Sequence, residues 1–185
     1  MTRFVDRGAI FAGWVGVGVG VVLVISVGLV IPVPVLVFAG ALPVGALVGM
    51  YANQRSERRR PRRRVMANAL WAGAMTALAL AVFYVAIRML FVFADAGFPD
   101  FNRTDPITGQ PIPPYCETGP DCSYSRYVAG GYGPELAAAG VTDGASFTGY
   151  WLAGQANGAA LLVGLTLGGA AIAGGVRSLR SAPGS

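Results

Sequence analysis

The stretch that decides the fold is NQRSERRRPRRR, residues 53–64, in which seven of the twelve residues are arginine. It lies between segments too apolar for a soluble domain, and residues 8–52 contain no charged side chain at all. Cytoplasmic loops of membrane proteins carry an excess of arginine and lysine. The block therefore predicts a membrane protein and also the side of the membrane on which residues 53–64 lie.

The composition of the whole chain agrees with this interpretation. Of its 185 residues 12% are charged and 54% are hydrophobic, whereas about a quarter of the residues in a soluble domain are charged. The 27 glycines are typical of membrane helices that approach one another closely. All basic residues are arginine, which together with abundant alanine and valine is typical of a GC-rich bacterial genome.

Four apolar segments are long enough to cross a bilayer, since about 20 helical residues span its ~30 Å hydrocarbon core. Residues 8–52 are too many for one helix, and the prolines at 32 and 34 divide them because proline removes a backbone donor. We expect an all-α fold, a bundle of four transmembrane helices in a single membrane domain, residues 1–185. The expected spans are about 9–31, 35–52, 65–93 and 147–176.

The first apolar segment also shares two features with a cleaved signal peptide, because Arg3 and Arg7 precede it and Ala39-Gly40-Ala41 resembles a cleavage site. The apolar region of a signal peptide runs for about 7–15 residues, and this segment is longer. We therefore expect a first helix that is retained.

Charge is distributed unequally among the segments outside the spans. Residues 1–8, 53–64 and 176–185 together hold eleven arginines and two carboxylates, whereas residues 94–146 hold two arginines and seven carboxylates. We therefore expect a multi-pass protein of the cell membrane with both termini and the basic loop 53–64 in the cytoplasm. Residues 94–146 would form an acidic extracytoplasmic loop between the third and fourth helices.

The arginine block needs an acidic partner. The sequence pI of 9.7 alone would suit nucleic acid, but the basic residues are confined to a short loop between spans. We expect anionic lipid of the cytoplasmic leaflet instead, at about 1 kcal/mol per arginine near the surface, and no nucleic acid. Holding the orientation of the chain is the more general role of such a block. The expected lipid contacts are Arg55, Arg58, Arg59, Arg60, Arg62, Arg63 and Arg64.

Cys116 and Cys122 are separated by five residues in the predicted extracytoplasmic loop. In an oxidising compartment so close a pair forms a disulfide, which stabilises a small loop by roughly 2–3 kcal/mol. A metal or redox pair is the competing interpretation, but the chain has no histidine and no further cysteine. We expect a structural disulfide and no metal.

Arg88 is the only charged residue within a predicted span, and Gln155 and Asn157 enter the fourth span from the same side. An ionisable group inside a membrane suggests a functional site. These three residues are therefore a candidate binding site. The alternative is a structural role, in which they form hydrogen bonds between helices or Arg88 reaches the lipid headgroups.

Small residues recur at four-residue spacing on every predicted span. Residues four apart share a helix face, and small ones allow helices to pack closely; the alternative is that so much glycine and alanine produces such series by chance. The series are Ala12-Gly16-Gly20, Ala41-Gly45-Gly49, Ala69-Gly73-Ala77-Ala81, Gly154-Gly158 and Ala160-Gly164-Gly168.

The loop 94–146 has the only soluble-like composition in the chain. Its first half is dense in proline, aspartate and glycine and is typical of turns. Pro134, early in an Ala-Leu run that ends at Gly140, predicts a short helix. The loop has too few aliphatic residues for a sizeable core of its own.

Absent residues restrict the function further. Without histidine the chain lacks the commonest general base and metal ligand, and it has no P-loop, dinucleotide fingerprint or nucleophile elbow. We expect no enzymatic activity and no cofactor, but an accessory or assembly subunit that binds a membrane-protein partner or copies of itself. The alternative is a small oligomeric transporter or channel with its polar site at Arg88, Gln155 and Asn157. The four-span layout is similar to that of tetraspanins, but the Cys-Cys-Gly motif is missing and no family is assigned.

Overall fold

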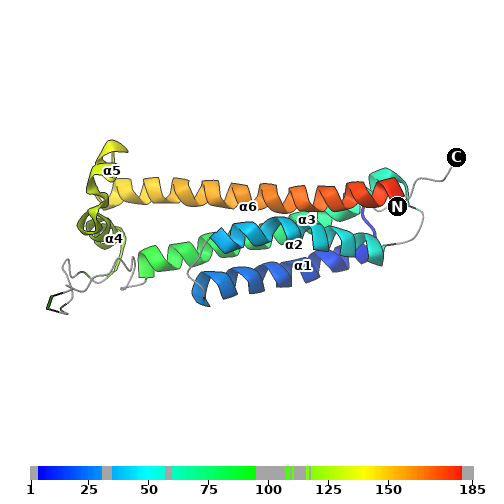
Figure 1. Cartoon of the computed structure of the whole chain (residues 1–185), viewed down its shortest axis with the longest axis horizontal. Helices are drawn as coiled ribbons and strands as arrows, with labels where there is room; N and C mark the ends of the chain where they lie inside the picture. The colour runs from blue at the N-terminus through cyan, green and yellow to red at the C-terminus, as the bar shows by residue number, and fades with distance from the viewer. Residues whose placement is uncertain are drawn as a thin grey trace. The chain divides into compact units, whose positions relative to one another are not determined.

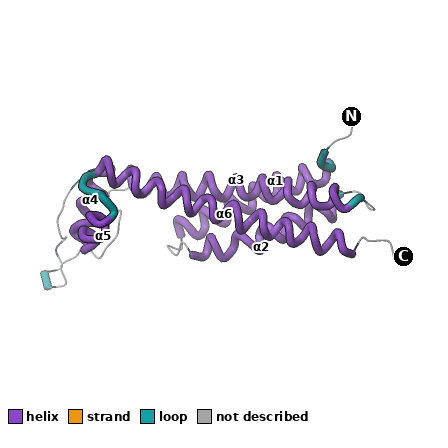
Figure 2. Tube along the Cα trace, turned by 90° about the horizontal axis from the view of Figure 1, so that it is seen from above, coloured by secondary structure: helices purple, strands orange, loops and turns teal. Residues whose placement is uncertain are grey.

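The computed structural model describes residues 4–30, 35–56, 60–94, 107–108, 110, 116 and 118–180, and all regular elements among them are helical (Figures 1 and 2). Four helices are long and apolar enough to cross a membrane. They are α1 (Arg7–Ile25), α2 (Val35–Arg55), α3 (Arg62–Ala94) and α6 (Gly144–Arg180). The shorter elements are the π-helical turns η1 (Ser26–Val30) and η2 (Val128–Tyr132) and the helices α4 (Pro120–Tyr127) and α5 (Gly133–Ala138).

The helices extend beyond the apolar segments that predicted them. α1 begins at Arg7 and continues through η1, α2 reaches Arg55, and α3 already begins at Arg62. The reason is that arginine is a good helix former, so the basic stretch lengthens both α2 and α3. The predicted proline turn at residues 31–34 lies outside the described residues.

The chain folds into two compact units. The first consists of Met1–Tyr84 and Gly158–Ser185, and the second of Val85–Asn157. α3 and α6 contribute residues to both units. In the first unit α1 and α2 lie alongside α3 and α6 (Figures 1 and 2).

Glycines bring the helices of the first unit together. A Cβ atom at Gly16 of α1 would collide with the Thr76 side chain of α3, and one at Gly45 of α2 with the carbonyl oxygen of Thr166 in α6. A Cβ atom at Gly73 of α3 would lie only 2.5 Å from the Cβ of Ala170. The series beginning at Ala12, Ala41 and Ala69 are therefore confirmed as packing faces, because only small residues allow this approach.

The second unit has a core of its own. Val92 of α3, Leu136 of α5 and Phe147 and Trp151 of α6 are buried together with Val141. The loop between α3 and α6 does not form this core alone, as expected. Val92, Phe147 and Trp151 come from the ends of the long helices.

Local signals explain how the short elements begin and end. The predicted short helix is confirmed as α5, which ends at Ala138 and is followed by Gly140, whose φ is 76°. The Gly140 and Val141 amides donate to the carbonyls of Ala137 and Leu136 at 3.0 and 2.9 Å, which is the Schellman arrangement. Only glycine adopts this backbone conformation without strain.

Candidate functional site

Arg88 lies on α3 in the second unit and contacts α6. Its Nε donates to Oε1 of Gln155 at 3.3 Å, and its Cζ lies 5.7 Å from the centroid of the Trp151 ring. Gln155 is 8% exposed and Trp151 is 5% exposed, so the cation–π contact is partly desolvated and stronger than one in water. The structure thus brings together two of the three predicted polar residues.

Asn157, the third, does not join this pair. It is exposed on α6, whereas Gln155 is buried. Successive residues of an α-helix are rotated by about 100°, so residues that are two positions apart point to nearly opposite sides of the helix. The prediction was wrong for Asn157 because it rested on depth along the span. Depth does not say to which side of the helix a residue points.

Tyr127 of α4 belongs to the same cluster. Burial raises the pKa of its phenol above the ordinary value, and the positive charge of Arg88 counteracts this in part. Its ring centroid lies 5.1 Å from that of Phe147. The phenol is therefore neutral at physiological pH, and the cluster combines one cation with an amide and aromatic rings, a composition suited to packing rather than to proton transfer.

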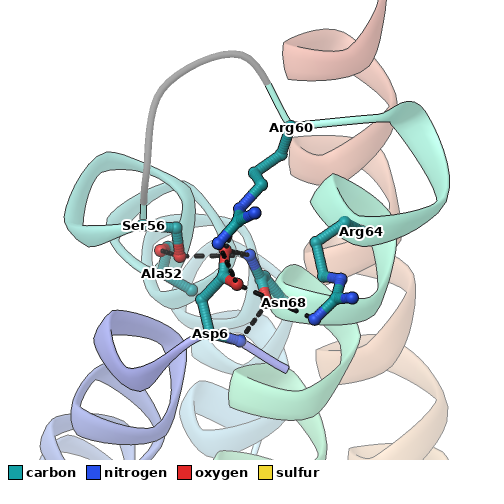
Figure 3. A network of polar contacts seen from close by, with 6 residues as sticks. All are labelled: Asp6, Ala52, Ser56, Arg60, Arg64 and Asn68. Atoms are coloured by element: carbon teal, nitrogen blue, oxygen red, sulfur yellow. Dashed lines mark hydrogen bonds and ion pairs between the residues drawn. The ribbon is translucent and has the colours of Figure 1, made fainter. Parts of the chain in front are cut away.

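The arginine block is organised around Asp6, which is 7% exposed (Figure 3). Arg60 contacts the Asp6 carboxylate twice, because Nε donates to Oδ2 at 3.2 Å and Nη2 lies 3.1 Å from Oδ1. Nη1 of Arg64 lies 3.8 Å from Oδ1. Two of the predicted lipid contacts therefore engage a carboxylate of the chain itself.

Asn68 of α3 completes this network and is fully buried (Figure 3). Its Oδ1 accepts the backbone N–H of Asp6 at 3.0 Å, and its Nδ2 donates to Oδ2 of Asp6 at 2.9 Å and to Oγ of Ser56 at 3.1 Å. The Ser56 hydroxyl donates in turn to the carbonyl of Ala52 at 2.6 Å. One amide thus ties the segment before α1 and the end of α2 to α3.

The other arginines of the block differ in their surroundings. Arg55 donates to the Tyr51 hydroxyl at 3.0 Å and lies over the Phe11 ring at 5.4 Å. Arg62 and Arg63 are exposed in the first turn of α3. Arg58 and Arg59 lie outside the described residues.

Sequence reasoning did not find Asp6, Asn68 or Trp151. Asn68 offered a signal, because a primary amide inside a predicted span requires a hydrogen-bond partner. Asp6 offered a weaker one as the only carboxylate before the first span. Trp151 offered no such signal, because tryptophan is common at membrane interfaces, and its contact with Arg88 depends on the rotation of α6.

The predicted disulfide between Cys116 and Cys122 is present, with Cα atoms 5.5 Å apart. Nη2 of the buried Arg126 donates to the Cys116 carbonyl at 2.9 Å, and the Ser123 hydroxyl donates to the Val92 carbonyl at 3.0 Å. These hydrogen bonds attach α4 to the disulfide loop and to α3. Among the described residues no group of three or more metal-ligating side chains occurs.

The glycines of α6 fall into two classes. Gly169 and Gly174 face other helices, since an added Cβ atom would meet Leu42 at one and Met66 at the other. At Gly164, Gly168 and Gly175 an added Cβ atom would have nothing within 4 Å. The predicted series Ala160-Gly164-Gly168 is thus not a packing face within the described chain.

Comparison with known proteins assigns no relative to this chain. No family model matches it, and neither the curated proteins nor the solved structures include a significant match.

Proposed function

We propose that this chain is a non-catalytic protein of the bacterial cell membrane. It would act as a subunit that docks a transmembrane helix of another membrane protein. α1, α2, α3 and α6 are the four spans, and the arginine-rich end of the first unit, with both termini, lies in the cytoplasm. The proposed role is accessory or in assembly. The docking surface is the open face of α6, defined as Ala160, Gly164, Gly168, Ala171 and Gly175.

The observation that carries the proposal is that no helix among the described residues covers the glycines of this face. Its residues are three or four apart and therefore lie on one side of the helix, and the three glycines have nothing within 4 Å of an added Cβ atom. By contrast, Gly45 and Gly73 meet other helices. α6 thus carries a glycine face like those that pack helices together within the chain. This face has no internal partner among the described residues.

Physical chemistry favours a helix as the occupant. Lipid tails are as apolar as leucine, so association in a bilayer depends on close packing, which small residues permit. Ile172, on the border of the open face, is 58% exposed, and a docked helix would cover it as well.

The competing proposal is a small oligomeric transporter or channel with Arg88, Gln155 and Asn157 along its path. The contacts of Arg88 support a structural role instead, because its guanidinium hydrogen-bonds to Gln155 and lies over Trp151. Asn157 lies on the other side of α6. We therefore favour the docking subunit.

Photo-crosslinking in native membranes tests the docking. A photoreactive residue replaces Ile172 in one protein and Val22 of α1, which is 64% exposed, in the other. We expect a discrete protein adduct from position 172 and only lipid adducts from position 22.

Glycine substitutions supply the matched control. Gly164→Leu with Gly168→Leu should abolish the adduct at position 172, since the added side chains hold a partner helix away. Gly18→Leu should leave the adduct unchanged, because Gly18 is equally open but lies on α1. Lipid adducts alone at both positions would contradict the docking proposal, and an adduct between copies of the chain would identify the partner as a second copy.

A further inference from the structure

We infer that Asp6 divides the arginines of the first unit between two tasks, leaving an exposed set that binds the phosphate groups of anionic phospholipids. This set, the basic surface, consists of Arg7, Arg55, Arg62 and Arg63, which are all exposed. Arg60 and Arg64 serve the fold instead. The inference depends on the proposed membrane orientation but not on the docking of a partner helix.

The fold gathers the basic surface from three helices. Arg7 begins α1 directly after Asp6, and an added Cβ atom at the next residue, Gly8, would collide with the carbonyl oxygen of Arg55 at the end of α2. The ion pairs of Asp6 with Arg60 and Arg64 hold the beginning of α3 at the same place (Figure 3). Arginines that are up to 56 positions apart in the sequence therefore lie at one end of the first unit.

The acceptor capacity of Asp6 is already in use. Oδ2 accepts from Arg60 and Asn68, and Oδ1 lies within ion-pair distance of Arg60 and Arg64. With 7% of its surface exposed, Asp6 is largely enclosed by these partners, and no ion pair joins it to Arg62 or Arg63 among the described contacts. The charges of Arg62 and Arg63 are therefore not balanced by Asp6.

The electrostatic potential at the amino end of α3 is positive, like the charges of the basic surface. The first turn of α3 contains Arg62, Arg63 and Arg64 and no acidic residue, and the amino end of a helix carries partial positive charge. Basic side chains at this end do not compensate the helix dipole but add to it. An anion placed beside Arg62 and Arg63 is attracted by both contributions.

Neighbouring side chains favour a lipid over a soluble anion. Phe4 is 79% exposed, Phe11 52%, Trp14 64% and Trp71 42%, and Arg55 lies over Phe11. Aromatic residues beside arginines are typical of the boundary between headgroups and acyl chains. A soluble phosphate would leave the aromatic side chains in water, whereas a phospholipid covers both kinds of residue.

The test measures the binding of phosphatidylglycerol to the purified full-length protein in phosphatidylcholine nanodiscs. Arg62→Gln with Arg63→Gln should lower the affinity about fivefold for each arginine, which corresponds to roughly 1 kcal/mol per basic residue near an anionic surface. The melting temperature in pure phosphatidylcholine should not fall, because neither residue belongs to the Asp6 network and neither charge compensates the dipole of α3.

The reciprocal variant separates the two tasks. Asp6→Asn should lower the melting temperature, because it releases Arg60 and Arg64 from their ion pairs. It should not lower the affinity for phosphatidylglycerol, since the four arginines of the basic surface keep their charges.

Two results would overturn the inference. One is unchanged lipid affinity after the Arg62 and Arg63 substitutions, and the other is inorganic phosphate that displaces phosphatidylglycerol at equal phosphate concentration. Failure of the protein to enter nanodiscs would instead refute the membrane proposal, so the two failures are distinguishable.

Discussion

A single amide, that of Asn68, links the parts of the chain that meet at the arginine-rich end of the first unit. Asn68 and Asp6 are 62 positions apart and exchange two hydrogen bonds. Because both residues are buried, an unsatisfied group left by substitution would be costly. This pair should therefore contribute more to stability than the exposed arginines around it.

We expect Asn68→Ala to lower the free energy of unfolding by about 2–3 kcal/mol, because it leaves the Asp6 amide and carboxylate short of partners in a buried site. Asn53→Ala is the matched control. Asn53 is also buried, with 7% of its surface exposed, but its amide donates to the Gly49 carbonyl of its own helix, at 3.2 Å. Denaturation of both variants in mixed detergent micelles measures the difference, and equal losses would show that the network is unimportant.

Asp143 provides a pH-dependent contribution at the beginning of α6. The Ser146 backbone amide donates to its carboxylate at 2.7 Å, and this bond, followed by one from the Ser146 hydroxyl, lowers the pKa of Asp143 from its ordinary value of 3.8. A carboxylate whose pKa is lower in the folded state stabilises the fold above the unfolded value and ceases to do so as the pH falls through the folded value.

Thermal unfolding of the wild type should therefore show no contribution from Asp143 to the pH dependence between pH 7 and about pH 5, and a loss of stability below about pH 4. Asp143→Asn should lack this loss, because asparagine caps a helix without titrating. Identical acid profiles for the two proteins would disprove the assignment.

At the scale of the helix, the same residue type serves two purposes. Gly45 is needed because the Thr166 backbone lies where its side chain would be, whereas Gly164 has open space. Glycine costs a helix interior about 0.5–1 kcal/mol relative to alanine. At Gly45 close packing against α6 compensates for this cost. At Gly164 no contact within the described chain compensates for it.

We expect Gly45→Ala to destabilise the isolated protein by about 1–3 kcal/mol, because an added methyl group forces α2 away from α6. Gly164→Ala should be neutral or stabilise by up to about 1 kcal/mol. Unfolding in detergent, where a partner is absent, measures both values. A comparable loss at Gly164 would indicate an internal contact of α6 and remove the open face.

At the scale of the whole molecule, two compact units share two helices. Helices α3 and α6 supply hydrophobic residues to the second unit through Val92, Phe147 and Trp151, and the disulfide closes the loop before α4. A short acidic segment thus acquires a core without many aliphatic residues of its own.

The proposed topology leads to a paired expectation. A fluorescent protein fused after Ser185 should fluoresce in the cytoplasm, since the proposal places both termini on the same side as the arginine block. In intact cells treated with a reductant, a membrane-impermeant maleimide should label Cys116 and Cys122. Labelling that requires cell lysis, or a periplasmic C-terminus, would reverse the orientation and with it the proposed lipid contacts.

Features that depend on residues close together in the sequence could be predicted from it, whereas contacts between distant residues could not. The disulfide was accessible because Cys116 and Cys122 are six positions apart, and α5 because Pro134 and Gly140 are local signals. The sequence identifies Arg88 as a charge within a span but not its contact with Trp151. It also places Asn157 at the same depth as Gln155, although the two side chains point to different sides of α6. Such errors are expected wherever a contact depends on the rotation of a helix about its own axis.

By itself the sequence determined four long apolar helices and a closed cysteine loop, because hydropathy and short-range spacing act within a segment. Only the tertiary structure decided that Asp6 holds Arg60 and Arg64, or that Gly45 is covered while Gly164 is open. Those outcomes depend on how helices rotate and cross, which is set by packing among residues far apart in the chain.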